Sequence, residues 1–128
     1  MDALELLKQD HEKVSELLER GQEADPKQRK QIFKEIKSEL ETHARIEETI
    51  FYPAMEEHEE LKDMVLESLE EHKQMKTVLR ELAKLSPNSE RFKPKFKVLK
   101  DNVKHHAVEE EEGKMFPKIR SIIDKSEL

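Results

Sequence analysis

The chain has 128 residues, with 24 Lys and Arg against 30 Asp and Glu, and a formal net charge of −6. This length predicts one domain over residues 1–128, and interleaved, mostly acidic charge argues against a nucleic-acid partner, which needs a basic face. The absence of Cys excludes disulfides and thiolate metal sites. No apolar run approaches the roughly 20 residues that span a bilayer, and the first residues lack a signal-like segment. We therefore expect a cytoplasmic protein with no membrane partner.

Few turn-forming residues are available, since the chain has only two Gly, and 42% of residues are charged. This composition favours long amphipathic helices with solvated outer faces. The first helix is predicted from Asp2, as the N-cap, to about residues 19–21, with Gly21 as a stop signal. His11 occupies a place in its apolar stripe where another Leu would be expected. The other stripe residues are Leu4, Leu7, Val14 and Leu18.

The second helix is predicted from about Pro26 to Met55, after the Asp25-Pro26 start signal. His43 and Glu47 continue its apolar stripe, and Pro53 should kink the helix or end it nearby. The stripe consists of Ile32, Ile36, Leu40, Ile50 and Ala54.

The third helix is predicted to begin between residues 57 and 60 and to end by Leu85, before a turn over 86–89. His72 is in phase with its stripe of Leu61, Val65, Leu69, Leu79 and Leu82. The fourth helix follows the turn, with a stripe of Phe92, Phe96, Leu99 and Val103 that His106 and Glu110 continue.

A motif of His, a Glu four residues later, and an aromatic residue before Pro occurs twice, over residues 43–53 and 106–117. A single His, His11 or His72, precedes each copy. The midpoints of successive histidines fall at residue 27, between residues 57 and 58, and at residue 89, each in a predicted turn. Antiparallel helices joined by short turns bring such residues to one level. The sequence therefore predicts an all-α, antiparallel up-down-up-down four-helix bundle with its histidines in one layer.

Residues i and i+4 share a helix face, so this layer would also hold Glu47 and Glu110. A buried carboxylate is costly unless it is paired or metal-bound, and no Lys or Arg shares the core phase nearby. We therefore predict a two-metal centre, with both glutamates bridging the ions. Its ligands would be His11, His43, Glu47, His72, His106 and Glu110. Imidazole and carboxylate suit iron, and they do not exclude manganese or zinc.

The fourth helix leaves alternatives open. His105 with Glu109 has the same spacing as His106 with Glu110, although its face carries the weaker apolar stripe. The second motif is also one residue longer before its Pro, so Glu111 competes with Glu110 through a π-bulge. We expect His58 to be exposed and Tyr52 to lie off the ligand face. Three methionines, Met64, Met75 and Met115, are expected to pack in the core.

The pattern of His11, His43 with Glu47 and Phe51-Tyr52-Pro53, His72, and His106 with Glu110 and Phe116-Pro117 resembles the haemerythrin-like family, the HHE cation-binding domains. The resemblance covers essentially the whole chain. It implies a left-handed four-helix bundle with a non-haem di-iron centre, bridging carboxylates and a bridging oxygen species. Oxygen-carrying members have an additional ligand His where this chain has Lys76, which makes reversible oxygen carriage doubtful.

The leading functional interpretation is a di-iron protein that binds dioxygen or a related small molecule, such as nitric oxide or peroxide. Leu7, Leu40, Ile50, Leu69, Leu79, Leu99 and Val103 would exclude water from the centre. The alternative is an iron- or oxygen-responsive sensor or iron-handling protein, in which metal stabilises the bundle and controls binding to a partner. Binding is favoured over enzymatic turnover, because the sequence supplies no recognisable substrate pocket, and it identifies no redox partner.

Overall fold

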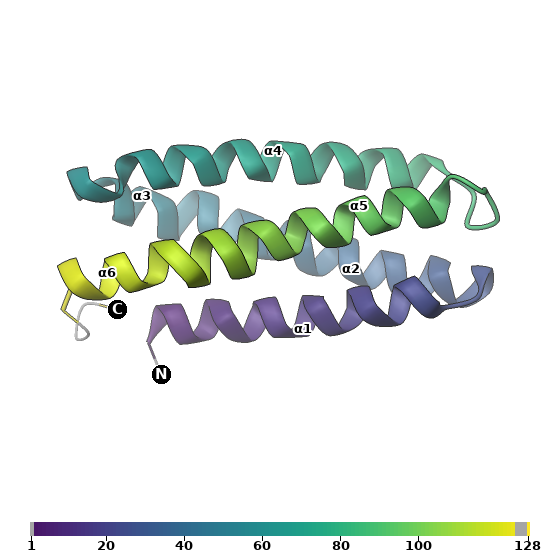
Figure 1. Ribbon diagram of the computed structural model, residues 1–128, viewed down its shortest axis with the longest axis horizontal. Coiled ribbons are helices and arrows are strands. Elements are labelled where there is room, and N and C mark those ends of the chain that lie inside the picture. Colours follow the sequence, from purple (N-terminus) through teal and green to yellow (C-terminus); the bar gives the residue numbers. More distant parts are fainter. Residues whose placement is uncertain (1, 125–127) are drawn as a thin grey trace.

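The computed structural model describes residues 2–124 and residue 128. Four helical rods run antiparallel, so both ends of the chain lie at the same end of the bundle (Figure 1). The first rod is α1 (Ala3–Glu23), and the second joins α2 (Pro26–Ile46), η1 (Glu47–Phe51) and α3 (Tyr52–Glu56). The third joins η2 (Glu59–Leu61) to α4 (Lys62–Lys84), and the fourth joins α5 (Phe92–Lys104), η3 (His105–Met115) and α6 (Phe116–Ile122). The predicted all-α four-helix bundle is confirmed.

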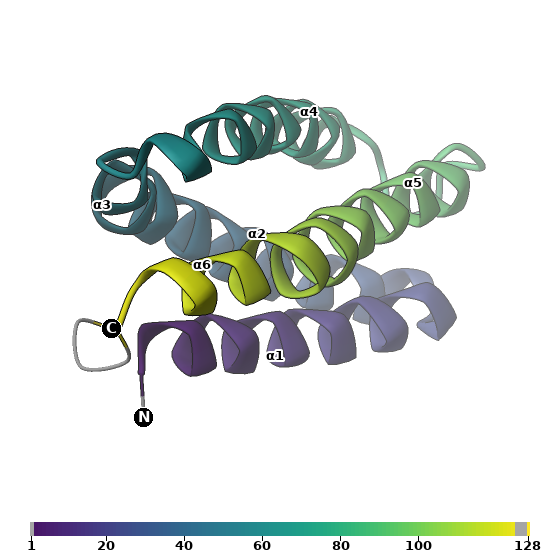
Figure 2. The same cartoon turned by 60° about the vertical axis from the view of Figure 1, so that its left-hand side comes forward.

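Each rod packs against two neighbours, which encloses one interior along the bundle. α1 contacts α2 and α5, and α4 contacts α5 and α3 (Figure 2). No helix among residues 2–124 is long and apolar enough to cross a membrane.

The helix starts predicted from capping residues are confirmed. The Asp2 side chain accepts a hydrogen bond from the Glu5 N–H at 2.9 Å, and the Asp25 side chain accepts one from the Gln28 N–H at 2.9 Å. The predicted stop at Gly21 is wrong, because α1 continues to Glu23. Gly21 is instead a close-packing position, where an added Cβ would lie 2.5 Å from the Phe96 ring.

Two segments of π-helix, η1 and η3, interrupt the second and fourth rods. The Tyr52 N–H donates to the Glu47 carbonyl, and the Phe116 N–H donates to the Glu111 carbonyl, which are both i to i−5 bonds. In each rod the second residue after the π-helical segment is a Pro, Pro53 or Pro117, which has no N–H to donate. The second rod ends at Glu56, three residues after Pro53, so the predicted end of this helix close to Pro53 is confirmed.

The π-helix also rotates the side chains that follow it. Ile50, predicted to exclude water from the centre, is 68% exposed, and Ala54 is exposed as well. Both predictions are wrong because they extrapolated an α-helical period through η1. Tyr52 takes the inward position instead and is 1% exposed.

The apolar interior consists of two clusters rather than one. One cluster, at the end of the bundle that holds the 86–89 turn, contains Val14, Leu40, Met75, Leu79, Leu99 and Val103 among others. The other, near the chain ends, contains Leu4, Leu7, Phe51, Val65, Met115 and Ile119, with Met64 and Leu69 partly buried against it. Where the two clusters meet, every rod contributes a buried His, and the second and fourth rods each add a buried Glu. The fold therefore places a polar layer between the two apolar clusters, which shield it from water.

Candidate metal centre

Six buried side chains from all four rods make up the polar layer. Their exposed fractions are 5% for His11, 8% for His43, 0% for Glu47, 2% for His72, 6% for His106 and 0% for Glu111. Burying ionisable groups so completely is costly unless they are paired or bind a cation. The layer is therefore either a dense ion-pair network or a metal site.

The four imidazoles present their Nε2 atoms to the interior in two pairs. The Nε2 atoms of His11 and His43 are 3.2 Å apart, and those of His72 and His106 are 3.0 Å apart. Two nitrogens at this separation can both ligate one ion, since metal–imidazole bonds are about 2.0–2.1 Å long for zinc. The histidines thus define two adjacent positions for metal ions.

Both carboxylates lie between the two pairs. Glu47 Oε1 is 3.3 Å from His43 Nε2 and 3.0 Å from His72 Nε2. Glu111 Oε1 is 3.2 Å from the Nε2 atoms of both His11 and His106. Two carboxylate oxygens, Glu47 Oε2 and Glu111 Oε1, are buried without a hydrogen-bond partner. Each glutamate can therefore bridge two cations, which would satisfy the oxygens that have no hydrogen bond.

A carboxylate outside the layer holds the other nitrogen of every imidazole. Nδ1 of His11 donates to Glu112 at 2.7 Å, and Nδ1 of His43 donates to Asp10 at 3.3 Å. Nδ1 of His72 donates to Glu48 at 2.8 Å, and Nδ1 of His106 donates to Glu71 at 2.9 Å. A proton held at Nδ1 leaves the Nε2 lone pair directed at the interior. Metal-ligating histidines are typically oriented by such partners.

The electrostatics of the layer favour positive charge. Burial opposes protonation of His106, but hydrogen bonds with Glu111, Glu47 and Glu71 outweigh it and raise its pKa to about 12. For His43, burial is likewise outweighed by Glu47 and Glu111, and its pKa rises to about 9. Burial would raise the pKa of Glu47, yet hydrogen bonds from Glu111 and the histidines hold it well below its usual value. In the metal-free layer, protons on the histidines supply the positive charge that metal ions would otherwise supply.

The structure brings together five of the six predicted ligands and replaces the sixth. Glu110 does not join the layer; its Oε1 lies 3.5 Å from His105 and 3.3 Å from Lys114. The residue that joins the layer is Glu111, five positions after His106, because η3 aligns residues i and i+5 rather than i and i+4. Selecting Glu110 as the inward residue was wrong for this reason, and the alternative of Glu111 through a π-bulge describes the structure.

Counting backward from proline would have found Glu111. Glu47 lies six residues before Pro53, and Glu111 lies six residues before Pro117. In both copies the Pro is the second residue after the π-helix, so the spacing from Glu to Pro is the same while the spacing from His to Glu differs by one. The position of the inward Glu in the repeated motif is therefore better predicted from the Pro than from the His.

Tyr52 is a buried residue beside the layer that sequence reasoning placed elsewhere. Its hydroxyl donates to Glu111 Oε2 at 3.0 Å and lies 3.3 Å from His106 Nε2 and 3.4 Å from His72 Nε2. Burial and the charges of Glu111 and Glu47 raise its pKa, so in the metal-free protein it is a neutral donor. It was placed off the ligand face because an α-helical period was carried through η1.

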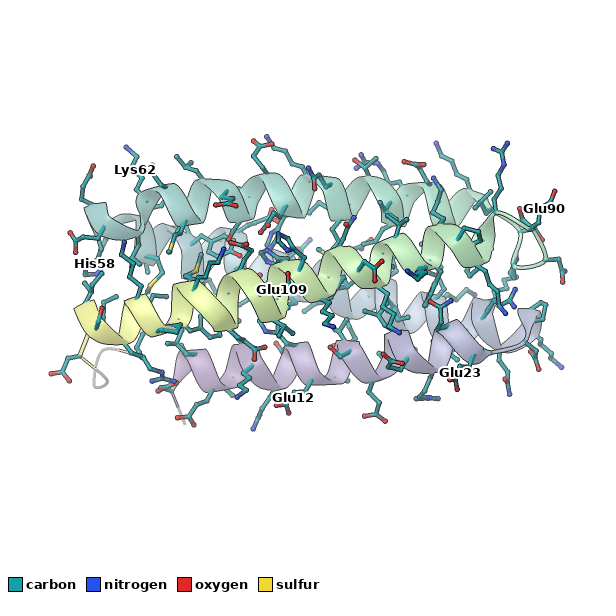
Figure 3. The ribbon with its side chains drawn as sticks, in the orientation of Figure 1. Glu12, Glu23, His58, Lys62, Glu90 and Glu109 are labelled. Atoms are coloured by element: carbon teal, nitrogen blue, oxygen red, sulfur yellow. The ribbon has the colours of Figure 1, made fainter. Side chains whose placement is uncertain are left out.

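Other candidates lie outside the layer. His105 is half exposed and contacts Glu71, Glu109 and Glu110. His58 is partly exposed and lies at one end of the molecule (Figure 3). Lys76 Nζ donates to Glu48 at 2.8 Å, so it supports the carboxylate behind His72 instead of entering the layer. Met75 and Met115 pack in the two apolar clusters, as expected.

The donor set fits a pair of metal ions. In the described part of the chain, one group of converging donors is His11, His43, Glu47 and Glu111, and a second is Glu47, His72 and His106. The groups share Glu47, and Glu111 reaches both of them, which is the arrangement of a dinuclear centre inside a bundle. Tyr52 lies beside the second group, which has fewer protein donors.

Comparison with known proteins agrees with this geometry. The model of the hemerythrin HHE cation binding domain matches residues 2–119. The chain is also 32% identical over 122 residues to a DNA nickase from Nostoc sp. strain PCC 7120; the match covers 94% of this chain but only 34% of that protein. No solved structure matches. The chain belongs to the hemerythrin HHE cation-binding domain family.

Proposed function

We propose that this chain is a non-haem di-iron protein that takes up dioxygen or a related small molecule, such as nitric oxide or peroxide. The observation that carries the proposal is the buried layer of four Nε2 atoms around two carboxylates, each of which reaches both histidine pairs. Iron favours such mixed imidazole and carboxylate donors. When bound, a ferrous pair supplies two electrons and open coordination positions to a small ligand.

The protein's own residues would hold the centre and limit access to it. His11 and His43 would bind one ion, His72 and His106 the other, and Glu47 and Glu111 would bridge them. Among the surrounding carboxylates, Glu48 and Glu71 keep the imidazole tautomers fixed. The two apolar clusters exclude bulk water, so only a small uncharged or weakly charged ligand is expected to enter.

The second ion has a less nitrogen-rich environment than in an oxygen carrier. The position four residues after His72 is Lys76, and its ammonium is bound to Glu48. Tyr52 places an oxygen beside this pair, with its hydroxyl 3.3 Å from His106 Nε2 and 3.4 Å from His72 Nε2. We therefore favour redox chemistry, sensing or iron handling over reversible oxygen carriage.

Anaerobic loading with ferrous iron tests the proposal. We expect two irons per chain after desalting, and new charge-transfer absorption when oxygen is admitted. Bands that disappear when oxygen is removed would support carriage or sensing, whereas irreversible oxidation would support redox chemistry or iron handling. A folded bundle that takes up no iron would contradict the proposal.

The Nostoc relative motivates a second candidate function, metal-dependent nicking of DNA. A surface groove of about 470 Å³ between α2 and α4 supports it, because cationic side chains outnumber acidic ones along its walls. Lys37, Arg45, Lys76 and Arg80 line this groove, together with Glu41 and Glu48. Glu48 contacts His72, so a phosphate backbone bound there would lie close to the centre.

Relaxation of supercoiled plasmid by the metal-loaded chain, with catalase present, tests this candidate. Nicking should weaken in R45A/R80A, which removes two groove cations, and persist in K13A/K100A, which removes two cations outside the groove. Equal nicking by both variants, or by free iron alone, would contradict it.

A further inference from the structure

A second His and Glu pair lies on the fourth rod, one residue before the pair that faces the centre. His105 and Glu110 have the same i,i+5 spacing in η3 as His106 and Glu111. They turn toward the surface, with side chains 52% and 15% exposed, respectively. The π-helix thus aligns an inner and an outer pair side by side.

The outer pair converges with Glu71 from α4. His105 Nε2 lies 3.2 Å from Glu71 Oε2 and 3.5 Å from Glu110 Oε1. One donor atom from each of these three residues lies within 4.8 Å of the others. Two rods therefore supply three ligand-type atoms to one point at the surface.

The imidazole of His105 is oriented in the same way as those of the centre. Its Nδ1 donates to Glu109 Oε2 at 2.8 Å, which directs Nε2 at Glu71 and Glu110. A neutral imidazole held in this way aims a lone pair at two carboxylate oxygens, and a cation between them would turn that repulsion into ligation.

The charge around His105 matches a divalent cation. Three carboxylates, those of Glu71, Glu109 and Glu110, surround the imidazole, and Lys114 Nζ contributes one positive charge 3.3 Å from Glu110. With a neutral imidazole, the group carries two negative charges in excess. Mixed imidazole and carboxylate donors are typical ligands of first-row divalent metals.

Glu71 connects the outer group to the centre. Its Oε1 accepts from His106 Nδ1 at 2.9 Å, while its Oε2 faces His105 Nε2. The same carboxylate therefore orients a ligand of the buried centre and contributes to the outer group. A cation held at the surface would lie one residue away from an imidazole of the centre.

We propose that Glu71, His105 and Glu110 form an outer site for a divalent first-row cation, from which metal passes to the buried centre. The transfer rests on the proposed function, because it requires the buried centre to bind metal; the outer site itself does not. The competing occupant is a proton, which would make His105 an imidazolium paired with the carboxylates. A mildly alkaline buffer favours the metal over the proton.

Binding of Mn²⁺ tests the outer site. The chain is loaded to its tightly bound metal content, desalted and titrated with Mn²⁺, and free Mn²⁺ is measured by electron paramagnetic resonance. We expect one further Mn²⁺ per chain, bound about tenfold or more weakly in H105N and in E110Q. The matched control is H58N, which changes a histidine that is also flanked by glutamates but lies far from Glu109 along the bundle (Figure 3). Equal Mn²⁺ affinity in the wild type and H105N would overturn the site.

The rate of Co²⁺ loading tests the transfer. Visible absorption of Co²⁺ reports ligation in the centre without any turnover, and H105N should fill the centre several-fold more slowly to the same final content, with H58N unchanged. An unchanged rate in H105N would overturn the transfer. If the desalted wild type holds no tight metal, the proposed function fails, whereas the Mn²⁺ difference between wild type and H105N still decides the outer site.

Discussion

Replacing Glu111 by Gln is expected to remove most of the stabilisation that metal in the buried centre gives the bundle, whereas E110Q should retain the stabilisation from that centre. Glu111 Oε1 lies 3.2 Å from His11 Nε2 and from His106 Nε2, so one substitution removes a charged ligand from both metal positions. Glu110 contacts His105 and Lys114 and does not reach the layer. The two neighbouring variants therefore separate the i,i+5 register of the π-helix from the i,i+4 register of an α-helix.

The expected size follows from mass action. Metal at about 1,000 times its Kd stabilises the fold by about 4.1 kcal/mol, and a hundredfold weaker site at the same concentration retains about 1.4 kcal/mol. For 128 residues, an unfolding entropy of about 0.27 kcal/mol/K converts this loss of about 2.7 kcal/mol into a Tm about 10 °C lower.

Calorimetry of both variants, with and without ferrous iron under anaerobic conditions, measures the effect. The metal-free Tm of each variant is its own reference, so any change in the stability of the apo fold cancels. A full metal-dependent rise in E111Q, together with its loss in E110Q, would refute the assignment of the inward carboxylate.

Three further predictions concern neighbouring features. Y52F should leave Glu111 Oε2 without its buried donor and destabilise the metal-free fold by about 1–3 kcal/mol, measured by urea unfolding, while the bound-metal count stays at two. In the metal-free chain, the protonated form of His43 stabilises the fold below pH 6.5, and this contribution of about 3 kcal/mol is lost as the pH rises through about 9. Metal affinity should rise over the same pH interval. A flat pH profile of both the unfolding free energy and the metal affinity would contradict this prediction. G21A should cost about 1–3 kcal/mol in urea unfolding, because Phe96 is 2% exposed and has little room to move away from the new methyl group; an unchanged stability would show that the ring can shift.

The bundle and the level of its histidines were predictable because both depend on averages over whole helices. His11, His43, His72 and His106 interrupt apolar stripes in phase, and their spacing about the turns fixes one layer even when helix ends are uncertain. The errors concern Ile50, Tyr52 and Glu110, which lie in or next to the π-helices. Single-residue changes of register are invisible to a periodicity argument, which assumes one period along a helix.

The π-helices explain why the two copies of the motif differ in length and yet build one site. In the second rod the bulge begins at Glu47 itself, so His43 and Glu47 still have α-helical spacing. In the fourth rod it begins at His105, so the extra residue falls between His106 and Glu111. Both bulges end one residue short of a Pro, where the missing N–H makes the return to α-helical bonding less costly. The insertion that lengthens the second copy therefore keeps Glu111 in the layer opposite Glu47, and it simultaneously brings His105 into register with Glu110 on the outside. A deletion that restores α-helical spacing in the fourth rod should accordingly disrupt the inner and outer groups together.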